Sequence, residues 1–103
     1  MKNTIALINQ IEEIQQRLKA DNLFESYERN FNRLFNIIEE EGYTCKNPLG
    51  EKYNDSRTDC EANIVGKEGK NMVITQVIKP IIYKQEGNET VLVQKGIVII
   101  EKK

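Results

Sequence analysis

Few side chains in this sequence are of the types that carry out chemistry. The chain has 103 residues and no histidine, so the most common general base and the most common metal ligand are both absent. Every Ser–His or Cys–His pairing of nucleophile and base is excluded for the same reason. The two cysteines, Cys45 and Cys60, stand fifteen positions apart without the spacing of a zinc or redox motif. We therefore expect two reduced thiols that act only as packing residues.

The carboxylates and glycines give no better support for catalysis. Glu12 and Glu13 are adjacent within a helical pattern, where a solvated helix face accounts for them. Asn54 and Asp55 are residue types that form turns by bonding nearby backbone. The glycines lack the spacing of a phosphate-binding loop. The sequence therefore predicts a protein that is not an enzyme and needs neither a metal nor another cofactor.

The composition is that of a soluble chain without a strong electrostatic field. Apolar residues make up 39%, charged residues 30%, and the formal net charge is −1. Binding to nucleic acid normally needs a clustered basic face, which is not present. No window reaches the ~18 consecutive apolar residues of a membrane span, and the start of the chain does not have the pattern of a signal peptide. We expect a cytoplasmic protein.

The first element that must position any site is a helix over residues 3–19. Its apolar residues recur at four, three and four positions, which is the periodicity of an amphipathic helix with a coiled-coil-like seam. The seam consists of Leu7, Ile11, Ile14 and Leu18.

A second helix is predicted over residues 23–41. Asn22 is expected to cap it, with Glu25 as the reciprocal partner of a capping box, and Gly42 is a natural residue to end it. The short break at residues 20–22 predicts either an antiparallel hairpin or one kinked helix. The second apolar stripe consists of Phe24, Tyr27, Phe31, Leu34, Phe35 and Ile38.

Two isolated helices cannot bury two such stripes. We expect two copies to associate into a four-helix bundle, so that the chain is a homodimer. In the alternative arrangement, the stripes pack against a sheet of the same chain. The residues predicted at the dimer interface are Leu7, Ile11, Ile14 and Leu18.

The rest of the chain is predicted to be β-rich. Residues 43–59 are polar and rich in turn formers, so they are expected to be a loop. Residues 86–89 (EGNE) predict a hairpin turn, and Pro80 predicts an edge, a bulge or a bend between two β runs. The fold class is thus α+β, with a helical dimerisation region over 1–42 and a small all-β domain over 43–103. Strands are expected within 60–65, 72–78, 81–84, 91–93 and 96–100.

Several of these features occur in an order that resembles a known family. Gly42 is followed by the seven residues YTCKNPL, by Gly50 and then by EKYND. Further on, VITQVI leads into Lys79-Pro80-Ile81, and Gln94-Lys95-Gly96 leads into IVIIEKK. Over roughly residues 22–102 the chain resembles the C-terminal part of the GrpE family, the nucleotide exchange factors of DnaK-type chaperones. It departs from that family at Thr58, Pro80 and Gln94, where the family has histidine, glycine and arginine.

The resemblance implies a cochaperone function. Dimeric helices would present β domains to the nucleotide-binding domain of a DnaK-type chaperone ATPase and promote the release of ADP. Sheet packing is the competing explanation for the three aliphatic residues of the partner-binding set. Two other functions stay open: a GrpE-fold adaptor without exchange activity, and a structural assembly protein held by its helices. The partner-binding residues implied are Val77, Lys79, Ile81, Val91 and Gln94.

Overall fold

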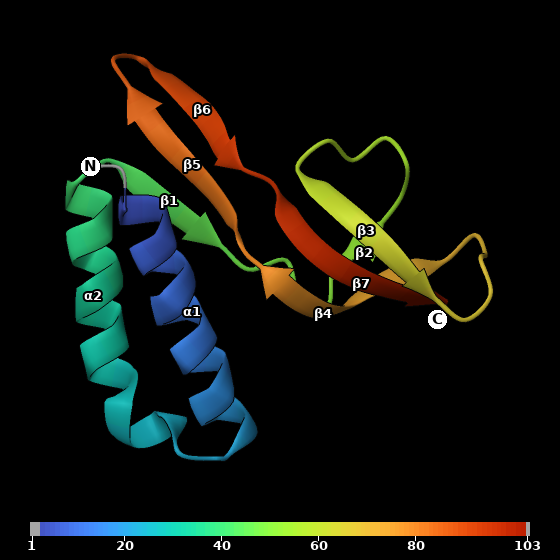
Figure 1. The fold of residues 1–103 in the computed structure, drawn as a ribbon, viewed down its shortest axis with the longest axis horizontal. Coiled ribbons are helices and arrows are strands. Elements are labelled where there is room, and N and C mark those ends of the chain that lie inside the picture. The colour runs from blue at the N-terminus through green and yellow to red at the C-terminus, as the bar shows by residue number, and fades with distance from the viewer. Residues whose placement is uncertain (1–2, 103) are drawn as a thin grey trace.

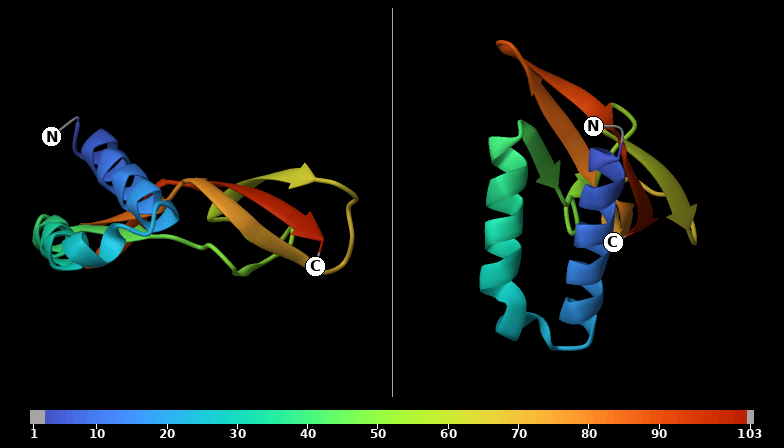
Figure 2. Two further views of the ribbon diagram at one scale, coloured as in Figure 1. Left: turned by 90° about the horizontal axis from the view of Figure 1, so that it is seen from below. Right: turned by 60° about the vertical axis from the view of Figure 1, so that its left-hand side comes forward.

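The chain folds as two helices followed by seven strands, which confirms the α+β class (Figure 1). The computed structural model describes residues 3–102. The molecule is flat, with principal extents of 40, 37 and 19 Å. The helices lie at one end and the C-terminal strands at the other, so a single long β ribbon connects the two ends (Figure 2).

The helical part is an antiparallel hairpin. Helix α1 spans Thr4–Ala20, a 3-10 turn η1 spans Phe24–Tyr27, and helix α2 spans Glu28–Glu40. The predicted ranges 3–19 and 23–41 are confirmed to within about one residue, although the second helix begins as a 3-10 turn. Of the two predicted arrangements, the hairpin is the one that forms (Figure 1).

The predicted capping box does not form. Asn22 has a left-handed backbone, with φ of 59°, and no side chain caps the start of the 3-10 turn. The backbone amide of Asn22 donates to the Lys19 carbonyl at 3.2 Å, and the backbone amide of Leu23 donates to the Leu18 carbonyl at 2.9 Å. This pair of hydrogen bonds is the C-terminal Schellman motif, in which asparagine tolerates the left-handed conformation. Asn22 therefore ends α1 and does not cap the second helix.

The seven strands form two sheets. The first is antiparallel, with the order β1-β5-β6. The second has the order β2-β4-β7-β3, in which β3 is parallel to β7 and the other pairs are antiparallel. The strands are β1 Tyr43–Lys46, β2 Lys52–Tyr53, β3 Cys60–Val65, β4 Met72–Lys79, β5 Ile81–Glu86, β6 Glu89–Gln94 and β7 Gly96–Lys102.

One long hairpin runs through both sheets. Only Pro80 separates β4 from β5, and only Lys95 separates β6 from β7. The turn that closes the hairpin lies between Glu86 and Glu89, as predicted, and Gly87 adopts φ of 62° there. Pro80 lies between β4 and β5, where the chain leaves the four-stranded sheet and enters the three-stranded one, so the predicted bend is also confirmed.

Bulges twist this hairpin near the bend. Strand β4 has two residues that lack a partner in β7, Thr75 and Ile78. Strand β6 has one such residue, Val93, because Leu92 and Gln94 pair with consecutive residues of β5. Each bulge increases the right-handed twist of its strand.

The stretch predicted as a loop, residues 43–59, contains two strands that the prediction missed. Gly42 ends α2 as expected, with φ of 91° and its amide donating to the Glu39 carbonyl at 2.9 Å. The chain then reverses directly into β1, which pairs with β5, and β2 pairs with the start of β4. Short polar strands of this kind form because a longer strand offers them a hydrogen-bonding edge, and a local pattern does not reveal that edge.

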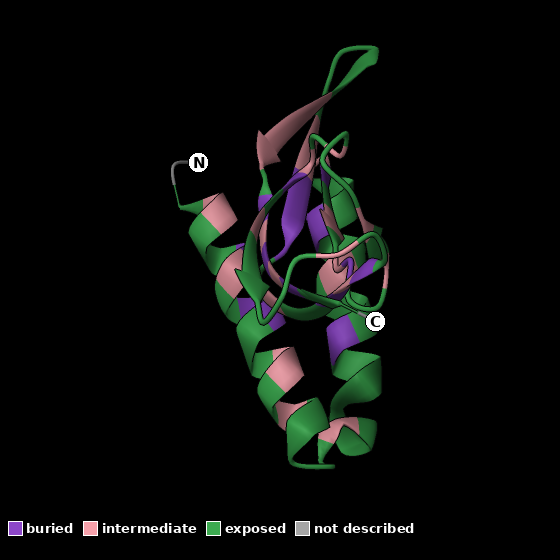
Figure 3. Cartoon of the chain, turned by 90° about the vertical axis from the view of Figure 1, so that its right-hand side faces the viewer, coloured by how far each residue is buried: buried purple, intermediate pink, exposed green. Residues whose placement is uncertain are grey.

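The buried residues form two cores (Figure 3). The first lies between the helices and the three-stranded sheet, and the second lies on one face of the four-stranded sheet, which we call its inner face. Helix α2 ends at Glu40 and β1 begins at Tyr43, and the first core includes residues from both sides of this change. Buried residues of the first core are Ile8, Ile11, Phe31, Ile38, Tyr43 and Ile82. Those of the second are Cys60, Met72, Ile74, Ile81, Val98 and Ile100.

The predicted dimer seam is divided between the chain's own core and the surface. Ile11 is only 9% exposed and Leu18 packs against the first core. Leu7 and Ile14 are 56% and 49% exposed. The expectation that all four residues face away from any core of the monomer is therefore wrong for Ile11 and Leu18, because both pack into the first core. A dimer through the helices stays a prediction, with Leu7 and Ile14 as its available side chains.

Charge substitutions on α1 should separate these two environments. We expect Ile11→Asp to destabilise the fold by about 3–5 kcal/mol, because it places an unpaired carboxylate in the first core. Ile14→Asp should change the free energy of unfolding by less than about 0.5 kcal/mol. Urea denaturation followed by circular dichroism measures both. Equal effects of the two substitutions would contradict this division of the seam.

The bend brings three segments into close contact at Gly96. A β-carbon at this position would lie 2.9 Å from Cγ1 of Ile81 and 3.2 Å from Sγ of Cys60. The amide of Gly96 also donates to the Asp59 carbonyl at 2.9 Å. The absence of a side chain therefore allows β5, β3 and β7 to meet at one point.

Gly96→Ala should destabilise the protein by about 1–3 kcal/mol, since the buried neighbours must move apart. Gly69→Ala is the matched control, because its β-carbon would meet only the flexible end of the exposed Lys102 side chain. The control should cost less than about 0.5 kcal/mol. Thermal and urea denaturation of both variants give the comparison, and an unaffected Gly96→Ala would show that the bend has room to relax.

Candidate functional site

The central strand β7 has apolar side chains on both faces, but only those on one face are fully buried. Val98 and Ile100 point to the inner face and are buried in the second core, whereas Ile97 and Ile99 point to the opposite, outer face and are partly exposed. A continuous apolar run in a central strand is typical of a sheet that is covered on both faces. The outer face of this sheet is therefore the first candidate for a binding surface.

Cross-strand pairing defines the residues of the outer face. Residues directly opposite one another on neighbouring strands point to the same side of a sheet. The two isoleucines therefore lie at the centre, with β3 on one side and β4 on the other. From β3 through β7 to β4, the rows are Glu61–Ile97–Lys79, Asn63–Ile99–Gln76 and Val65–Glu101–Val73.

On the outer face, the two isoleucines of β7 have charged or polar neighbours on β3 and β4, and Glu101 follows them along β7 between two valines. Glu61 and Lys79 flank Ile97 on opposite sides and are both exposed. The Thr75 hydroxyl donates to the Glu101 carboxylate at 2.6 Å, which orients that charge across the face. An apolar centre surrounded by polar and charged residues is the usual anatomy of a protein–protein interface.

The partner-binding residues implied by the resemblance do not lie on one surface. Lys79 is exposed on the outer face. Val77 packs against the second core on the inner face, and Ile81 is fully buried, at 0% exposure. Sheet packing is therefore the correct explanation for Ile81, which cannot contact a partner.

The other two implied residues lie in the helical half of the molecule. Val91 pairs with Lys84 in the three-stranded sheet. Gln94 and Asn9 of α1 exchange two side-chain hydrogen bonds, both at 2.8 Å, and the Gln94 amide also donates to the Pro80 carbonyl at 2.8 Å. Gln94 thus fixes α1 to the bend, and its amide group is already occupied within the chain.

An arginine network holds the connection that crosses the inner face. Strands β2 and β3 lie at opposite edges of the four-stranded sheet, so residues 54–59 must cross it. Arg57 donates to Asp59 at 2.7 Å, to Glu51 at 2.9 Å and to the Lys52 carbonyl at 3.1 Å. The Arg57 guanidinium lowers the pKa of the Asp59 carboxyl below its usual range. Thr58 directly follows Arg57 and therefore lies in the segment that these hydrogen bonds hold in place.

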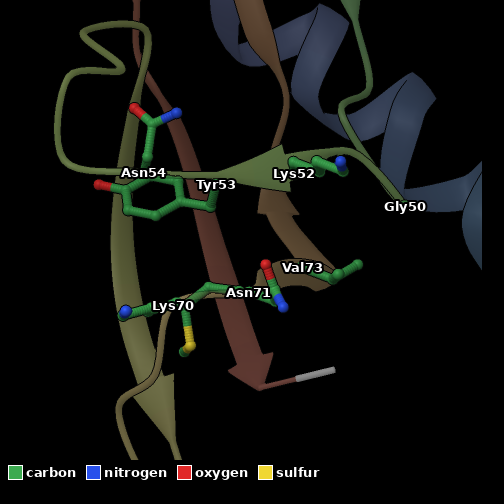
Figure 4. A pocket seen from close by; sticks show the side chains of 8 residues that line it. Gly50, Lys52, Tyr53, Asn54, Lys70, Asn71 and Val73 are labelled. Carbon is green, nitrogen blue, oxygen red and sulfur yellow. The ribbon is translucent and has the colours of Figure 1, made fainter.

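A surface cavity of about 440 Å³ lies beside β2 and the start of β4 (Figure 4). Tyr53 and Lys70 stand at its margin, with amide side chains and main chain between them. The lining contains no carboxylate and no thiol, and its ionisable side chains are Lys52, Tyr53 and Lys70. The lining residues are Gly50, Lys52, Tyr53, Asn54, Lys70, Asn71, Met72 and Val73.

The two thiols are free and shielded. Burial, with a smaller contribution from the charge of Glu12, raises the pKa of Cys45 to about 12. Burial, followed by the charge of Asp59, also raises the pKa of Cys60 above that of an ordinary thiol. A raised pKa suppresses the reactive thiolate. Within residues 3–102 no group of three or more His, Cys, Asp or Glu side chains is placed to hold a metal ion.

Comparison of the chain with known protein families, with curated proteins and with solved structures finds no match. None of the helices in the described part of the chain has the length and apolar character needed to cross a membrane. The GrpE resemblance therefore rests only on the residues quoted for it in the sequence.

The shielded thiols should resist alkylation. With a pKa of about 12, Cys45 carries a thiolate in only ~1 in 10,000 molecules at pH 8. We expect iodoacetamide at pH 8 to modify both cysteines in urea and to modify the folded chain at least about 100-fold more slowly. Mass spectrometry of timed samples measures the rates. Rapid labelling of the folded protein would show a reactive thiol.

The stability of the folded chain should fall as the pH rises in the alkaline range. The folded-state pKa of Cys45 lies above its unfolded value, so the folded state binds more protons at alkaline pH. The associated stability is present below the unfolded pKa and is lost as the pH rises towards 12. Cys45→Ala should therefore lose less stability than the unmutated chain between pH 8 and 11, as measured by urea denaturation.

Proposed function

We propose that this chain is a protein-interaction module that binds another protein through the outer face of its four-stranded sheet. One observation carries the proposal: Ile97 and Ile99 point to the outer face of the central strand β7 and stay partly exposed, whereas Val98 and Ile100 of the same strand are buried in the second core. Apolar area on a monomer that is surrounded by charge marks an interaction site more often than a solvated surface.

The chemistry of the described residues supports binding and gives no support to turnover. No buried side-chain nitrogen or oxygen within residues 3–102 lacks a hydrogen-bond partner, so no orphaned polar group waits for a substrate. The carboxylates Asp59 and Glu51 are paired with Arg57. For binding a partner, burial of apolar surface is the remaining source of favourable free energy, at roughly 25 cal/mol per Å² of apolar area buried.

Of the two GrpE-like functions, we favour the adaptor over the exchange factor. The resemblance implied that Ile81 and Gln94 contact the chaperone, yet Ile81 is buried and Gln94 is bonded to Asn9 and Pro80. Lys79 alone of that set lies on the outer face. A DnaK-type ATPase remains the first partner to test, because an exchange factor needs only a difference in affinity between open and closed states of its target.

The test compares one substitution on the outer face with one on the helices. Ile99→Lys places a charge at the centre of the proposed interface, and Ile37→Lys places the same charge on an exposed position of α2. The purified chain should bind its partner, identified by co-purification, and Ile99→Lys should weaken that binding at least tenfold. Ile37→Lys should bind as the unmutated chain does. Isothermal titration with the purified partner gives the affinities.

Two outcomes separate the functions. If a DnaK-type chaperone binds and releases a fluorescent ADP analogue faster in stopped-flow measurements, the chain is an exchange factor, and Lys79→Glu should reduce the effect. If a partner binds the outer face without any effect on ADP release, the chain is an adaptor. Loss of binding in Ile37→Lys with full binding in Ile99→Lys would refute the outer face as the site.

A further inference from the structure

Helix α1 buries one carboxylate that no cation of the described residues neutralises. Glu12 is only 5% exposed, so the solvated helix face expected from the sequence is wrong for this residue. Arg17 pairs with the neighbouring Glu13 at 3.9 Å, and the other ion pairs of residues 3–102 all belong to Arg57. Charged side chains are rarely this buried in proteins unless a cation or a metal ion pairs with them.

Two amide side chains hold one oxygen of this carboxylate. Gln16, one turn further along α1, donates to Oε1 of Glu12 at 2.8 Å, and Asn47 donates to the same oxygen at 2.9 Å. Because Asn47 directly follows β1, these hydrogen bonds fix the side chain between the helix and the sheet. Neither amide carries a charge, so the negative charge of Glu12 stays uncompensated.

The second oxygen of Glu12, Oε2, opens into a cavity. The two amide hydrogen bonds are the ones that the described residues make to this carboxylate, and both end on Oε1. Every fully buried side-chain oxygen of residues 3–102 has a hydrogen-bond partner, so Oε2 must keep contact with open space. That space is a cavity of about 220 Å³, which Glu12 lines together with other residues of α1 and the end of β4.

The cavity has an acidic side and an apolar side. Glu12 and Glu13 of α1 are the charged residues of its described lining, and no lysine or arginine accompanies them there. The side formed by β4 and the bend carries Val77, Ile78 and Pro80. The complementary ligand is therefore a cation that is joined to an apolar chain.

We propose that this cavity binds an alkylammonium group, which is the end of a lysine side chain or of a free polyamine. The nitrogen pairs with Oε2 of Glu12, and the methylene chain lies along Ile78 and Pro80. An ammonium group has three donors and no acceptor, which suits a site whose free charged groups are carboxylates.

Two other cations fit the cavity less well. The guanidinium of arginine is a planar fork that matches both oxygens of a carboxylate, but Oε1 of Glu12 is already occupied by two amides. A divalent metal ion needs about six oxygen ligands, and no third acidic side chain lines this cavity in the described part of the chain. A metal ion would also leave the apolar side without a contact.

The site does not depend on the proposed function, because small amines test it without a protein partner. We expect n-butylammonium at pH 7 to cause saturable shifts in the nuclear magnetic resonance signals of the Gln16 and Asn47 side-chain amides. n-Butanol lacks the charge and ammonium lacks the chain, so each should bind at least about tenfold more weakly. Equal binding of n-butanol, or saturation by Mg²⁺ without a response to n-butylammonium, would overturn the proposal.

Two further ligands identify the source of the ammonium group. Nα-acetyl-lysine methylamide represents a lysine of a protein, and putrescine represents a free polyamine. Gln76 belongs both to the cavity lining and to the outer face, so a protein bound to that face is one source of the lysine. Tighter binding of the lysine derivative assigns the site to a protein partner, and tighter binding of putrescine assigns it to a free polyamine. The absence of binding by both would overturn the proposal.

Substitution of Glu12 tests the role of its charge. Glu12→Gln keeps a side-chain oxygen that can accept from Gln16 and Asn47, but it removes the charge. It should weaken n-butylammonium binding at least about tenfold. Glu40→Gln, the same change at an exposed position of α2, should leave the affinity within about twofold of the original. Unchanged affinity in a folded Glu12→Gln variant would overturn the proposal.

A second variant tests the site without a change to the buried carboxylate. Ile78 is 54% exposed, so Ile78→Lys should be tolerated by the fold. Its side chain places an alkylammonium group at the cavity, so the variant should no longer bind added n-butylammonium. Leu7→Lys is the matched control, because Leu7 is 56% exposed on α1 and lies outside the cavity lining. The control should bind as the unmutated chain does, and full binding by Ile78→Lys would overturn the proposal.

Discussion

The whole arrangement depends on the point where the long hairpin passes from one sheet to the other. At that point Pro80 bends one strand, Lys95 interrupts the other, and Gly96 leaves room for Ile81 and Cys60. Gln94 then ties the bend to α1 through Asn9. If this crossing were straight, both halves of the hairpin would face one layer. Because it is bent and twisted, the β5–β6 half contributes Ile82 and Val93 to the core beneath the helices and also Ile81, Tyr83 and Leu92 to the second core.

Much of the fold follows from local patterns. The two helices, the end of α2 at Gly42, the bend at Pro80 and the turn at residues 86–89 were all predictable, since each depends on spacing or on the conformational preference of one residue. Strand β1 was not, because a short polar strand forms only when β5 offers it an edge. Asn22 was misassigned for a related reason: asparagine serves equally at the end of one helix and at the start of the next, and only the backbone angle decides.

The candidate site could be predicted only in part. The apolar run of β7 indicates a central strand, but it does not say which face another element covers. Here the inner face is crossed by residues 54–59, a polar segment held by Arg57 and not by apolar contacts. Sequence patterns assign such a segment to solvent. The local pattern therefore could not show that Ile97 and Ile99 stay partly exposed while Ile81 is buried.

The parallel pairing of β3 with β7 has a consequence for the order of folding. The β4–β7 hairpin closes around a two-residue turn, so its contacts form by local zippering, which is fast. Cys60 can pair only with Gly96, 36 residues later in the chain. Forming that contact costs more loop-closure entropy than closing the hairpin. During synthesis, β3 leaves the ribosome well before β7, the strand with which it pairs. The strand with the most regular free edge therefore stays unpaired until the last strand of the sheet has formed, and during that interval pairing with another chain competes with its docking.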